Sequence, residues 1–241
     1  MNTLAVILAR AGSEGLANKH LRLICGRPVV EYTFDHAAES KLLGKTVVST
    51  DCQRVKELAR ARGLPVIDRP AELATSSASV QDAMLHAMDV VESQGNFHAE
   101  ALVVLYGNVP IRQGGIIDEA LHLLRKTGCD SVRSFCPVGK WHPAWMSRLA
   151  GDRVEPFIPG SIHRRQDLAP LYLHDGAVVA VSREAMLRGR EHRNDPHAFF
   201  GIDRRAVVTG VGQTVEIDHA RDLLLAEAMV KEATFPKARV A

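Results

Sequence analysis

Aromatic side chains and paired cysteines are what this sequence has least of. Phe, Trp and Tyr together make up 5% of its 241 residues, too few for a surface on which nucleic-acid bases stack. The four cysteines stand at positions 25, 52, 129 and 136 without a C-x-x-C pair, which excludes the usual zinc spacing and a disulfide scaffold. We expect buried free thiols instead. The eleven histidines show no H-E-x-x-H or similar metal-ligand spacing.

The chain also lacks a large net charge and a long apolar run. Its formal net charge is +2, whereas a general nucleic-acid binder carries a strong basic stripe. No apolar stretch reaches the length of a membrane span, and the first residues lack the charged region and cleavage site of a signal peptide. We therefore expect a soluble cytoplasmic protein that binds neither nucleic acid nor membrane.

Hydrophobic residues make up 46% of the chain, enough for the core of one large domain over residues 1–241. We predict strands over 3–9, 46–49, 65–67, 102–106, 131–135, 176–181, 206–209 and 214–217, and helices over 29–40, 53–62, 79–93, 115–126 and 219–232. This alternation predicts an α/β fold with a Rossmann-like, mostly parallel sheet and helices on both faces. Ligands of such sheets bind at the carboxyl ends of the strands.

The segment from about 137 to 170 breaks this alternation. It is rich in Pro, Gly, Arg, Trp and His and shows little periodicity. Long irregular segments in compact domains usually serve a function or an interface. We expect a small excursion that packs on a partner subunit through Trp141, Trp145, Met146 and Phe157, so that the protein is a homodimer.

The most informative segment is a loop that opens with Arg10 and closes on Lys19, directly after a buried apolar strand. Gly12, Ser13 and Gly15 let the backbone approach a ligand closely, so that its N–H groups can point at phosphate oxygens. The two cations can neutralise the charge of those oxygens. The loop is neither a Walker A nor a Rossmann glycine motif. An ordinary turn with a surface Arg and Lys is the alternative.

Two acids lie close together near the end of the chain. If residues 214–217 form a strand, Glu216 and Asp218 point to the same face, because side chains alternate along a strand. Two carboxylates held together favour a cation between them, and hard oxygen ligands suit Mg²⁺. The alternative is a solvated edge strand, with Asp218 capping the last helix.

Other polar residues follow strand ends or gather in the irregular segment. Arg10, Asp51 and Tyr106 come just after predicted strands, which places them at one edge of the sheet. Asp51 is equally well explained as the N-cap of the next helix. Arg165 lies in a basic cluster that could clamp a carboxylate or phosphate, although a solvated loop is the simpler interpretation for Arg164. Together with the loop and the acids, this combination describes nucleotidyl transfer from a triphosphate.

Seven segments stand in order along nearly the whole chain: LARAGSEGLANK (8–19), VVSTD (47–51), RPAEL (69–73), Pro110 to Arg112, Arg165-Gln166, DGA (175–177) and EID (216–218). In this order they resemble the acylneuraminate (CMP-sialic acid) cytidylyltransferase family. The resemblance implies a nucleotide-diphospho-sugar transferase fold, usually dimeric, that uses Mg²⁺. It also implies transfer of a cytidylyl group from CTP to the anomeric hydroxyl of a 2-keto-3-deoxy sugar acid, which releases pyrophosphate and activates the sugar for polysaccharide biosynthesis.

The resemblance also assigns roles to residues of this chain. Nucleotide binding is implied for Ala9, Arg10, Gly12, Ser13, Lys19, Arg69, Ala78 and Ser79, of which Arg10 and Lys19 are the catalytic pair on the triphosphate. Acceptor binding is expected at Tyr106, Asn108, Arg165 and Asp175, and metal binding at Glu216 and Asp218. No residue is assigned as a general base.

The chain departs from the family pattern mainly on the acceptor side. His20 stands where the family usually has Asn, Tyr106 to Arg112 replace Q-P-T-S-P-x-R, and Leu173 to Gly176 replace R-P-N-G. The first metal acid is Glu216 rather than Asp. Our hypothesis is that nucleotide activation is retained, with an acceptor less anionic than N-acetylneuraminate or bearing an amino group. The alternatives are another nucleotide, a 3-deoxy-octulosonate-like acceptor, or a nucleotide-binding module without catalysis.

Overall fold

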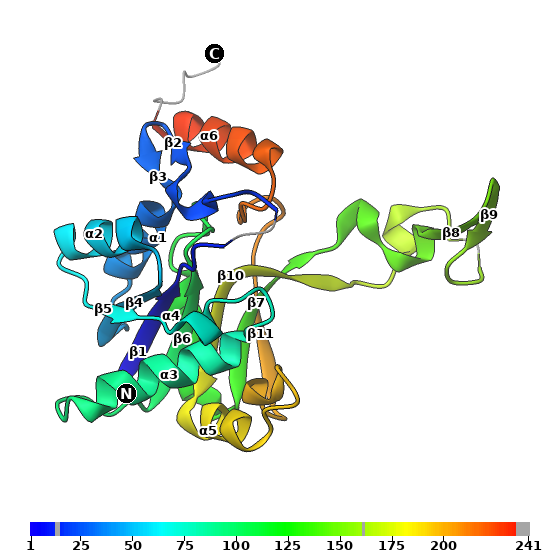
Figure 1. Cartoon of the computed structure of the whole chain (residues 1–241). Coiled ribbons are helices and arrows are strands. Elements are labelled where there is room, and N and C mark those ends of the chain that lie inside the picture. The colour runs from blue at the N-terminus through cyan, green and yellow to red at the C-terminus, as the bar shows by residue number, and fades with distance from the viewer. Residues whose placement is uncertain (13–14, 161, 235–241) are drawn as a thin grey trace, which may run out of the picture.

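A seven-stranded sheet forms the centre of the computed structural model, which describes residues 1–12, 15–160 and 162–234 (Figure 1). The strands run in the order β11-β7-β10-β6-β1-β4-β5. Their bounds are β1 (Thr3–Leu8), β4 (Lys45–Thr50), β5 (Val66–Asp68), β6 (Ala101–Tyr106), β7 (Ser131–Pro137), β10 (Tyr172–Ser182) and β11 (Arg204–Val208). All neighbours are parallel except β10, which runs antiparallel to both β6 and β7. The expected mostly parallel sheet is confirmed.

Helices cover both faces of this sheet, as the alternation predicts. Their bounds are α1 (Val29–Glu39), α2 (Gln53–Ala61), α3 (Val80–Ser93), α4 (Ile116–Thr127), α5 (Arg183–Glu191) and α6 (Ala220–Thr234). Along β1, Ala5 and Ile7 pack in the core under α1, α2 and α4, whereas Leu4 and Val6 pack in the core under α3 and α5. A strand buried on both faces must be apolar throughout, which explains the continuous hydrophobic run of β1.

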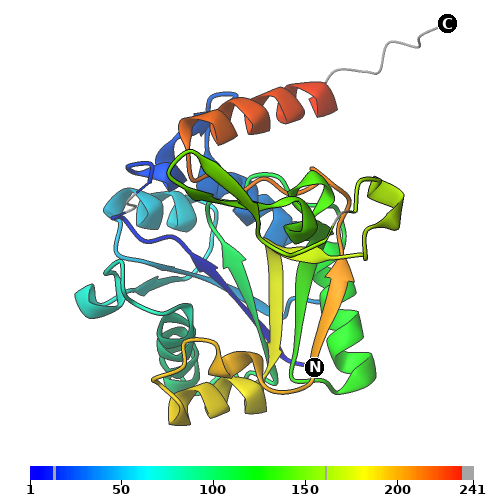
Figure 2. The same cartoon turned by 90° about the vertical axis from the view of Figure 1, so that its right-hand side faces the viewer.

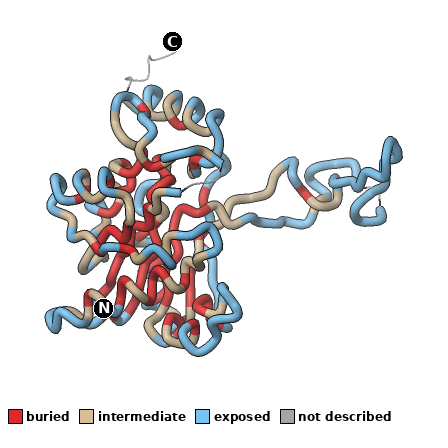
Figure 3. The backbone as a smooth tube through the Cα atoms, in the orientation of Figure 1, coloured by how far each residue is buried: buried red, intermediate tan, exposed pale blue. Residues whose placement is uncertain are grey.

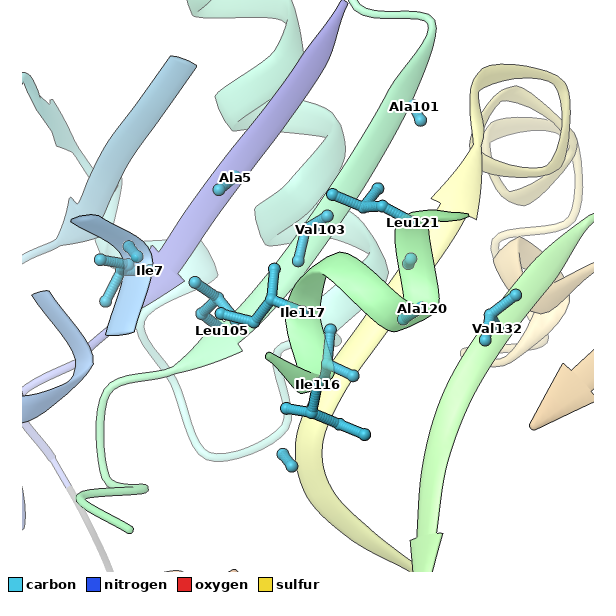
Figure 4. Close-up of a cluster of buried hydrophobic side chains, with 14 of the residues drawn as sticks. Ala5, Ile7, Ala101, Val103, Leu105, Ile116, Ile117, Ala120, Leu121 and Val132 are labelled. Carbon is cyan, nitrogen blue, oxygen red and sulfur yellow. The ribbon is translucent and has the colours of Figure 1, made fainter. Parts of the chain in front are cut away.

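Figure 4 shows how α4 lies on one face of the sheet. Its Ile116, Ile117 and Leu121 are buried against Val103 and Leu105 of β6. The apolar residues three to five positions apart on α4 form the stripe that an amphipathic helix turns to the core. This packing fixes the carboxyl end of β6, from which the loop with several candidate site residues continues.

The predicted N-terminus of α3 is confirmed in detail. Ser79 is the N-cap, and its Oγ accepts a hydrogen bond of 3.0 Å from the backbone N–H of Asp82. The cap satisfies one of the free donors in the first helical turn and fixes where the helix begins. Because α3 starts beside the carboxyl end of the sheet, its cap also places Ser79 at the edge where ligands bind.

The predicted strand over 214–217 is wrong. Val215 forms only a single antiparallel bridge with Ile111. Val215 and Ile217 are nevertheless buried in a small core with α6 and the hairpin of β2 (Leu23–Ile24) and β3 (Arg27–Pro28), which the sequence analysis did not predict. Burial of alternate residues in an irregular segment gives the same hydrophobic pattern as a strand. Helix α5 was also not predicted.

The irregular segment between β7 and β10 projects from the body as an arm (Figures 1 and 2). Its tip is a hairpin of β8 (Ser147–Ala150) and β9 (Arg153–Pro156), all of whose residues are exposed. Figure 3 shows the contrast between this exposed arm and the buried sheet. The arm exposes large apolar side chains, namely Trp141, Trp145, Met146, Leu149, Val154, Phe157, Ile158 and Ile162. Within the described ranges, every helix is too short or too polar to traverse a lipid bilayer.

Candidate active site

A cleft of about 250 Å³ opens at the carboxyl ends of β1 and β6, beside the start of α3. It brings together eight of the residues that the sequence analysis singled out: Arg10, Lys19, Arg69, Ala78, Ser79, Tyr106, Asn108 and Glu216. Leu8, Gly15, His20, Leu73, Val80 and Ala83 complete its lining. The loop after β1 and the acidic segment near α6 therefore meet in one site, although they lie at opposite ends of the sequence.

Three cations line this cleft. Arg69 is buried and donates from Nε to Ser49 Oγ (3.1 Å) and from Nη2 to the Ser49 carbonyl (2.8 Å), which ties its guanidinium to the end of β4. Burial lowers the pKa of Arg69 to about 10, so the side chain stays charged at neutral pH. Arg10 donates from Nη1 to the Gly12 carbonyl. The third cation is Lys19.

The loop after β1 is tied to the end of β4. The Ala9 N–H donates to the Ser49 carbonyl (3.2 Å), and the Thr50 hydroxyl donates to the Ala9 carbonyl. The Asp51 carboxylate accepts from the Ala11 N–H at 2.8 Å, so it holds the loop. Asp51 does not cap α2, for which no side-chain cap forms. Ser13 lies outside the described residues.

Gly15 brings the loop directly against the acidic segment. A Cβ atom at this position would lie 2.8 Å from the Asp218 carbonyl oxygen, closer than such atoms approach one another. Only glycine fits this approach without a backbone shift. The close packing of Gly15 against Asp218 therefore requires a glycine whether or not a ligand is bound.

His20 is a site residue whose role the sequence analysis missed. It is buried in the lining of the cleft, and burial, reinforced by the charges of Lys19 and Arg69, lowers its pKa to about 3. The imidazole is thus neutral at physiological pH. A Cβ atom on Gly107 would come within 3.1 Å of His20 Cδ2, so the glycine makes room for the ring. The signal was present as two departures from the family pattern, at positions 20 and 107.

Glu216 and Asp218 each contact a different residue of the cleft lining. Lys19 Nζ lies 2.8 Å from Asp218 Oδ1, and Glu216 Oε1 accepts from Asn108 Nδ2 at 3.0 Å. Among the described residues, no group of three or more His, Cys, Asp or Glu side chains could hold a metal ion. Mg²⁺ commonly binds one or two carboxylates and completes its shell with water and substrate phosphates. The donor set of Glu216 and Asp218 fits this mode of binding.

Tyr106 and Arg112 shape the wall of the cleft that follows β6. Burial raises the pKa of Tyr106 to about 12, and the negative charge of Glu216 adds to this, so its hydroxyl stays protonated. Arg112 is buried and donates to the carbonyls of Tyr106 (2.7 Å), Val109 (2.6 Å) and Ala177 (2.8 Å). Arg112 therefore fixes the loop that carries Tyr106.

Two residues predicted to bind the acceptor lie outside the cleft lining. Asp175 Oδ2 accepts from the hydroxyls of Thr209 (2.6 Å) and Thr214 (2.8 Å). Burial alone would raise the pKa of Asp175, but these hydrogen bonds lower it and keep the carboxylate ionised. Arg165 lies on the arm, near Gly139. Contacts of Asp175 and Arg165 with an acceptor stay predictions.

Residues 4–202 match the model of the family described as cytidylyltransferase. The chain belongs to the cytidylyltransferase family. It is 33% identical over 192 residues to the N-acylneuraminate cytidylyltransferase of Streptococcus agalactiae, in an alignment that covers 78% of this chain and 45% of the relative. The chain thus spans about half the length of that curated relative.

One further relative and one solved structure cover nearly the whole chain. The CMP-N,N'-diacetyllegionaminic acid synthase of Legionella pneumophila is 25% identical over 234 residues, which are 96% of this chain and 97% of the relative. The solved structure of a CMP:2-keto-3-deoxy-manno-octonic acid synthetase complexed with CTP has a TM-score of 0.71 and 19% identity, covering 97% of this chain and 100% of that one. The second likeness establishes the nucleotide-sugar transferase fold.

Proposed function

We propose that this protein moves a cytidylyl group from CTP to the anomeric hydroxyl of a sialic-acid-like 2-keto-3-deoxy sugar acid. One observation carries the proposal: the cations Arg10, Lys19 and Arg69 share a single cleft with the carboxylate of Glu216. Arg10 and Lys19 suit the phosphates of a triphosphate, Arg69 suits the nucleoside beside them, and the acid suits a divalent cation. The family match supports cytosine as the base.

In this reaction the anomeric oxygen of the sugar acid bonds to the α-phosphorus of CTP, and the bond from that phosphorus to the leaving pyrophosphate breaks. The products are the CMP-sugar, pyrophosphate and one proton. Arg10 and Lys19 neutralise charge on the leaving phosphates, together with backbone N–H groups of the loop after β1. Arg69, Ala78 and Ser79 frame the ribose and the base.

Glu216 and Asp218 would hold Mg²⁺ in this site. When bound, the ion lowers the pKa of the attacking hydroxyl and offsets charge on pyrophosphate. Glu216 already lines the cleft, and Asp218 is within a hydrogen bond of Lys19, the cation of the phosphate loop. These two contacts support the assignment of both carboxylates to one magnesium site.

The acceptor that we propose is a sialic-acid-like sugar other than ordinary N-acetylneuraminate. Tyr106 and Asn108 line the cleft and differ from the residues that the family usually has there. The Legionella pneumophila relative, named for a diacetyllegionaminic acid product, aligns over 96% of the chain. The protonated hydroxyl of Tyr106 can donate a hydrogen bond to a polar group of the sugar and accept one from it.

We also propose that the protein is a homodimer joined by its arm. The arm makes an extended hairpin whose Leu149 and Val154 are paired across β8 and β9 and are 74% and 66% exposed. Apolar side chains exposed together on a projection favour burial against another surface. A second copy of the chain carries the same hairpin and would supply such a surface.

The decisive experiment incubates the full chain with Mg²⁺, one nucleoside triphosphate and one acceptor at a time. CTP, UTP, ATP and GTP are each paired with N-acetylneuraminate, N,N'-diacetyllegionaminic acid and 3-deoxy-manno-octulosonate. Pyrophosphate release and product mass are measured. We expect turnover with CTP alone, and faster turnover with the legionaminic acid than with N-acetylneuraminate.

Each other outcome overturns a defined part of the proposal. Brisk turnover of N-acetylneuraminate removes the acceptor assignment, and preference for the octulosonate replaces it with the alternative acceptor class. Turnover with another triphosphate contradicts the assignment of cytosine as the base. A chain that releases pyrophosphate with none of these pairs lacks the proposed activity.

A further inference from the structure

Asn108 is joined to the acidic segment by three hydrogen bonds. Its Nδ2 donates to Glu216 Oε1 at 3.0 Å and to the Ile217 carbonyl at 3.1 Å. Its own carbonyl accepts from the Ile217 N–H at 2.8 Å. Asn108 is 3% exposed, so these bonds form where water competes little.

The partners of the side chain leave one orientation for the amide. A carboxylate oxygen and a carbonyl oxygen both accept hydrogen bonds, so the group that faces them must be the nitrogen of Asn108. Both amide hydrogens are then used. The Nδ2 group of Asn108 therefore serves the protein rather than a ligand, and the residue acts on the site through Glu216.

Buried hydrogen bonds hold the loop that carries Asn108, and the segment that carries Glu216 lies against this loop. Arg112 fixes the carbonyls of Tyr106 and Val109 on the two sides of Asn108. The acidic segment has only the single bridge of Val215 as regular structure. The hydrogen bonds of Asn108 thus join the acidic segment to a loop that Arg112 holds.

Gly176 leaves room beside the second oxygen of Glu216. A Cβ atom at this position would lie 3.3 Å from Glu216 Oε2, and Gly176 has a φ of +76°, which other residues rarely adopt. The Asn108 amide therefore holds Glu216 through Oε1, and the absence of a side chain at Gly176 leaves Oε2 room.

We propose that Asn108 is a positioning residue that fixes the Glu216 carboxylate for a divalent cation. This inference rests on the proposed function, in which Glu216 is a magnesium ligand. Residues that hydrogen-bond to ligating carboxylates orient them, and their loss commonly weakens metal binding by about 10- to 100-fold. Asn108 thus determines how tightly the cleft holds Mg²⁺ with the triphosphate.

The test compares Asn108→Leu with Gln81→Leu, a control that removes a buried amide of the same kind away from the acids. Gln81 donates from Nε2 to the Gly189 carbonyl (2.8 Å) and accepts from the Phe199 N–H (3.0 Å). Mg²⁺ binding is measured by calorimetry on each full chain saturated with a non-hydrolysable CTP analogue and without acceptor. Turnover is then measured as a function of Mg²⁺ concentration.

We expect Asn108→Leu to weaken Mg²⁺ binding at least about 10-fold and to raise the Mg²⁺ concentration needed for half-maximal turnover. Gln81→Leu is expected to lower the melting temperature and leave Mg²⁺ binding unchanged. If Asn108→Leu does not fold, Asn108→Thr keeps a hydroxyl donor and is expected to weaken binding less. Equal Mg²⁺ affinity in the wild type and the folded Asn108 variant overturns the inference.

The same data separate this inference from the proposed function. A wild-type chain that binds neither the CTP analogue nor Mg²⁺ contradicts the proposed function itself. A wild-type chain that binds both, beside an Asn108 variant of equal affinity, contradicts only the positioning role. A loss of Mg²⁺ binding in Gln81→Leu as large as in Asn108→Leu also contradicts it, because the effect is then one of general stability.

Discussion

Lys19 Nζ lies 2.8 Å from Asp218 Oδ1, across a separation of 199 residues in the sequence. The pair joins the last residue of the loop after β1 to one of the two acids proposed to hold Mg²⁺. Both groups therefore have a partner before a ligand binds. A bound triphosphate and its divalent cation would offer each group a new partner. Phosphate oxygens suit Lys19, and a divalent cation suits Asp218.

Lys19→Ala should reduce turnover far more than stability. Lys19 is 19% exposed and Asp218 is 52% exposed, and such ion pairs contribute about 0–1 kcal/mol. We expect kcat/KM for CTP to fall on the order of 100-fold or more, as for loss of a group that stabilises transition-state charge. Lys56→Ala, which removes the exposed pair of Lys56 with Asp68, is the control. Equal losses of activity in both variants would contradict the role of Lys19.

Asp218→Asn should raise the Mg²⁺ concentration needed for half-maximal turnover, or abolish turnover. The amide keeps the size of the side chain but loses the charge that a hard cation requires. Asp68→Asn is the matched control, because it also removes the acid of an exposed lysine pair. Unchanged Mg²⁺ dependence in Asp218→Asn would remove Asp218 from the metal site.

His20 should make the folded chain less stable as the pH falls. Its pKa is 6.5 when unfolded and about 3 when folded, so between these values the unfolded state binds the extra proton. Stability should therefore increase from pH 3 to pH 6.5, with a contribution of up to about 1.4 kcal/mol per pH unit. His20→Asn is expected to flatten this slope in urea melts across that range. If it does so no more than the surface control His122→Gln, the burial argument fails.

Gly107→Ala should disturb the packing beneath the cleft, around Leu8 and His20. Its new Cβ would lie 3.1 Å from Ala9 Cβ, from His20 Cδ2 and from the Leu8 carbonyl oxygen. Overpacking of this kind costs about 1–3 kcal/mol. We expect a lower melting temperature and a higher KM for CTP, whereas Gly114→Ala, with nothing within 4 Å, should change neither through crowding. A Gly107→Ala chain with wild-type KM would show that this packing adapts.

Leu149→Glu on the arm should separate the subunits. A charge at the centre of a buried apolar contact is costly, so the proposed dimer should sediment as a monomer. Val211→Glu, at an equally exposed apolar residue away from the arm, is the control and should sediment as the wild type. A wild-type chain that sediments as a monomer contradicts the proposed dimer directly.

Local signals in the sequence were sufficient for most of the fold. The apolar run of β1 and the Ser79 cap each depend on neighbours within a few residues, and both were predicted. The antiparallel direction of β10 depends on pairing with β6 and β7, far away in the sequence, and no local pattern encodes it. The false strand near Val215 has the same origin, because its burial comes from α6 and a hairpin.

The candidate site was predicted better in its residue types than in its contacts. The family resemblance assigned Arg10, Lys19 and Glu216 to nucleotide and metal binding, and the structure brings these three residues into one cleft. The hydrogen bond between Asn108 and Glu216 depends on how two loops far apart in the sequence lie against each other. The pattern of side chains along the sequence does not predict such a contact. The neutral state of His20 likewise follows from burial among cations brought together only by folding.

The arm connects two strands, β7 and β10, that are antiparallel neighbours in the sheet. The arm is therefore a long connection between the two strands of a β-hairpin. At its base, the Val138 N–H donates to the Leu171 carbonyl (3.0 Å). A tight turn of two residues is all that such a connection needs. The projection can thus change in length or sequence without any change in the order or direction of the strands in the sheet.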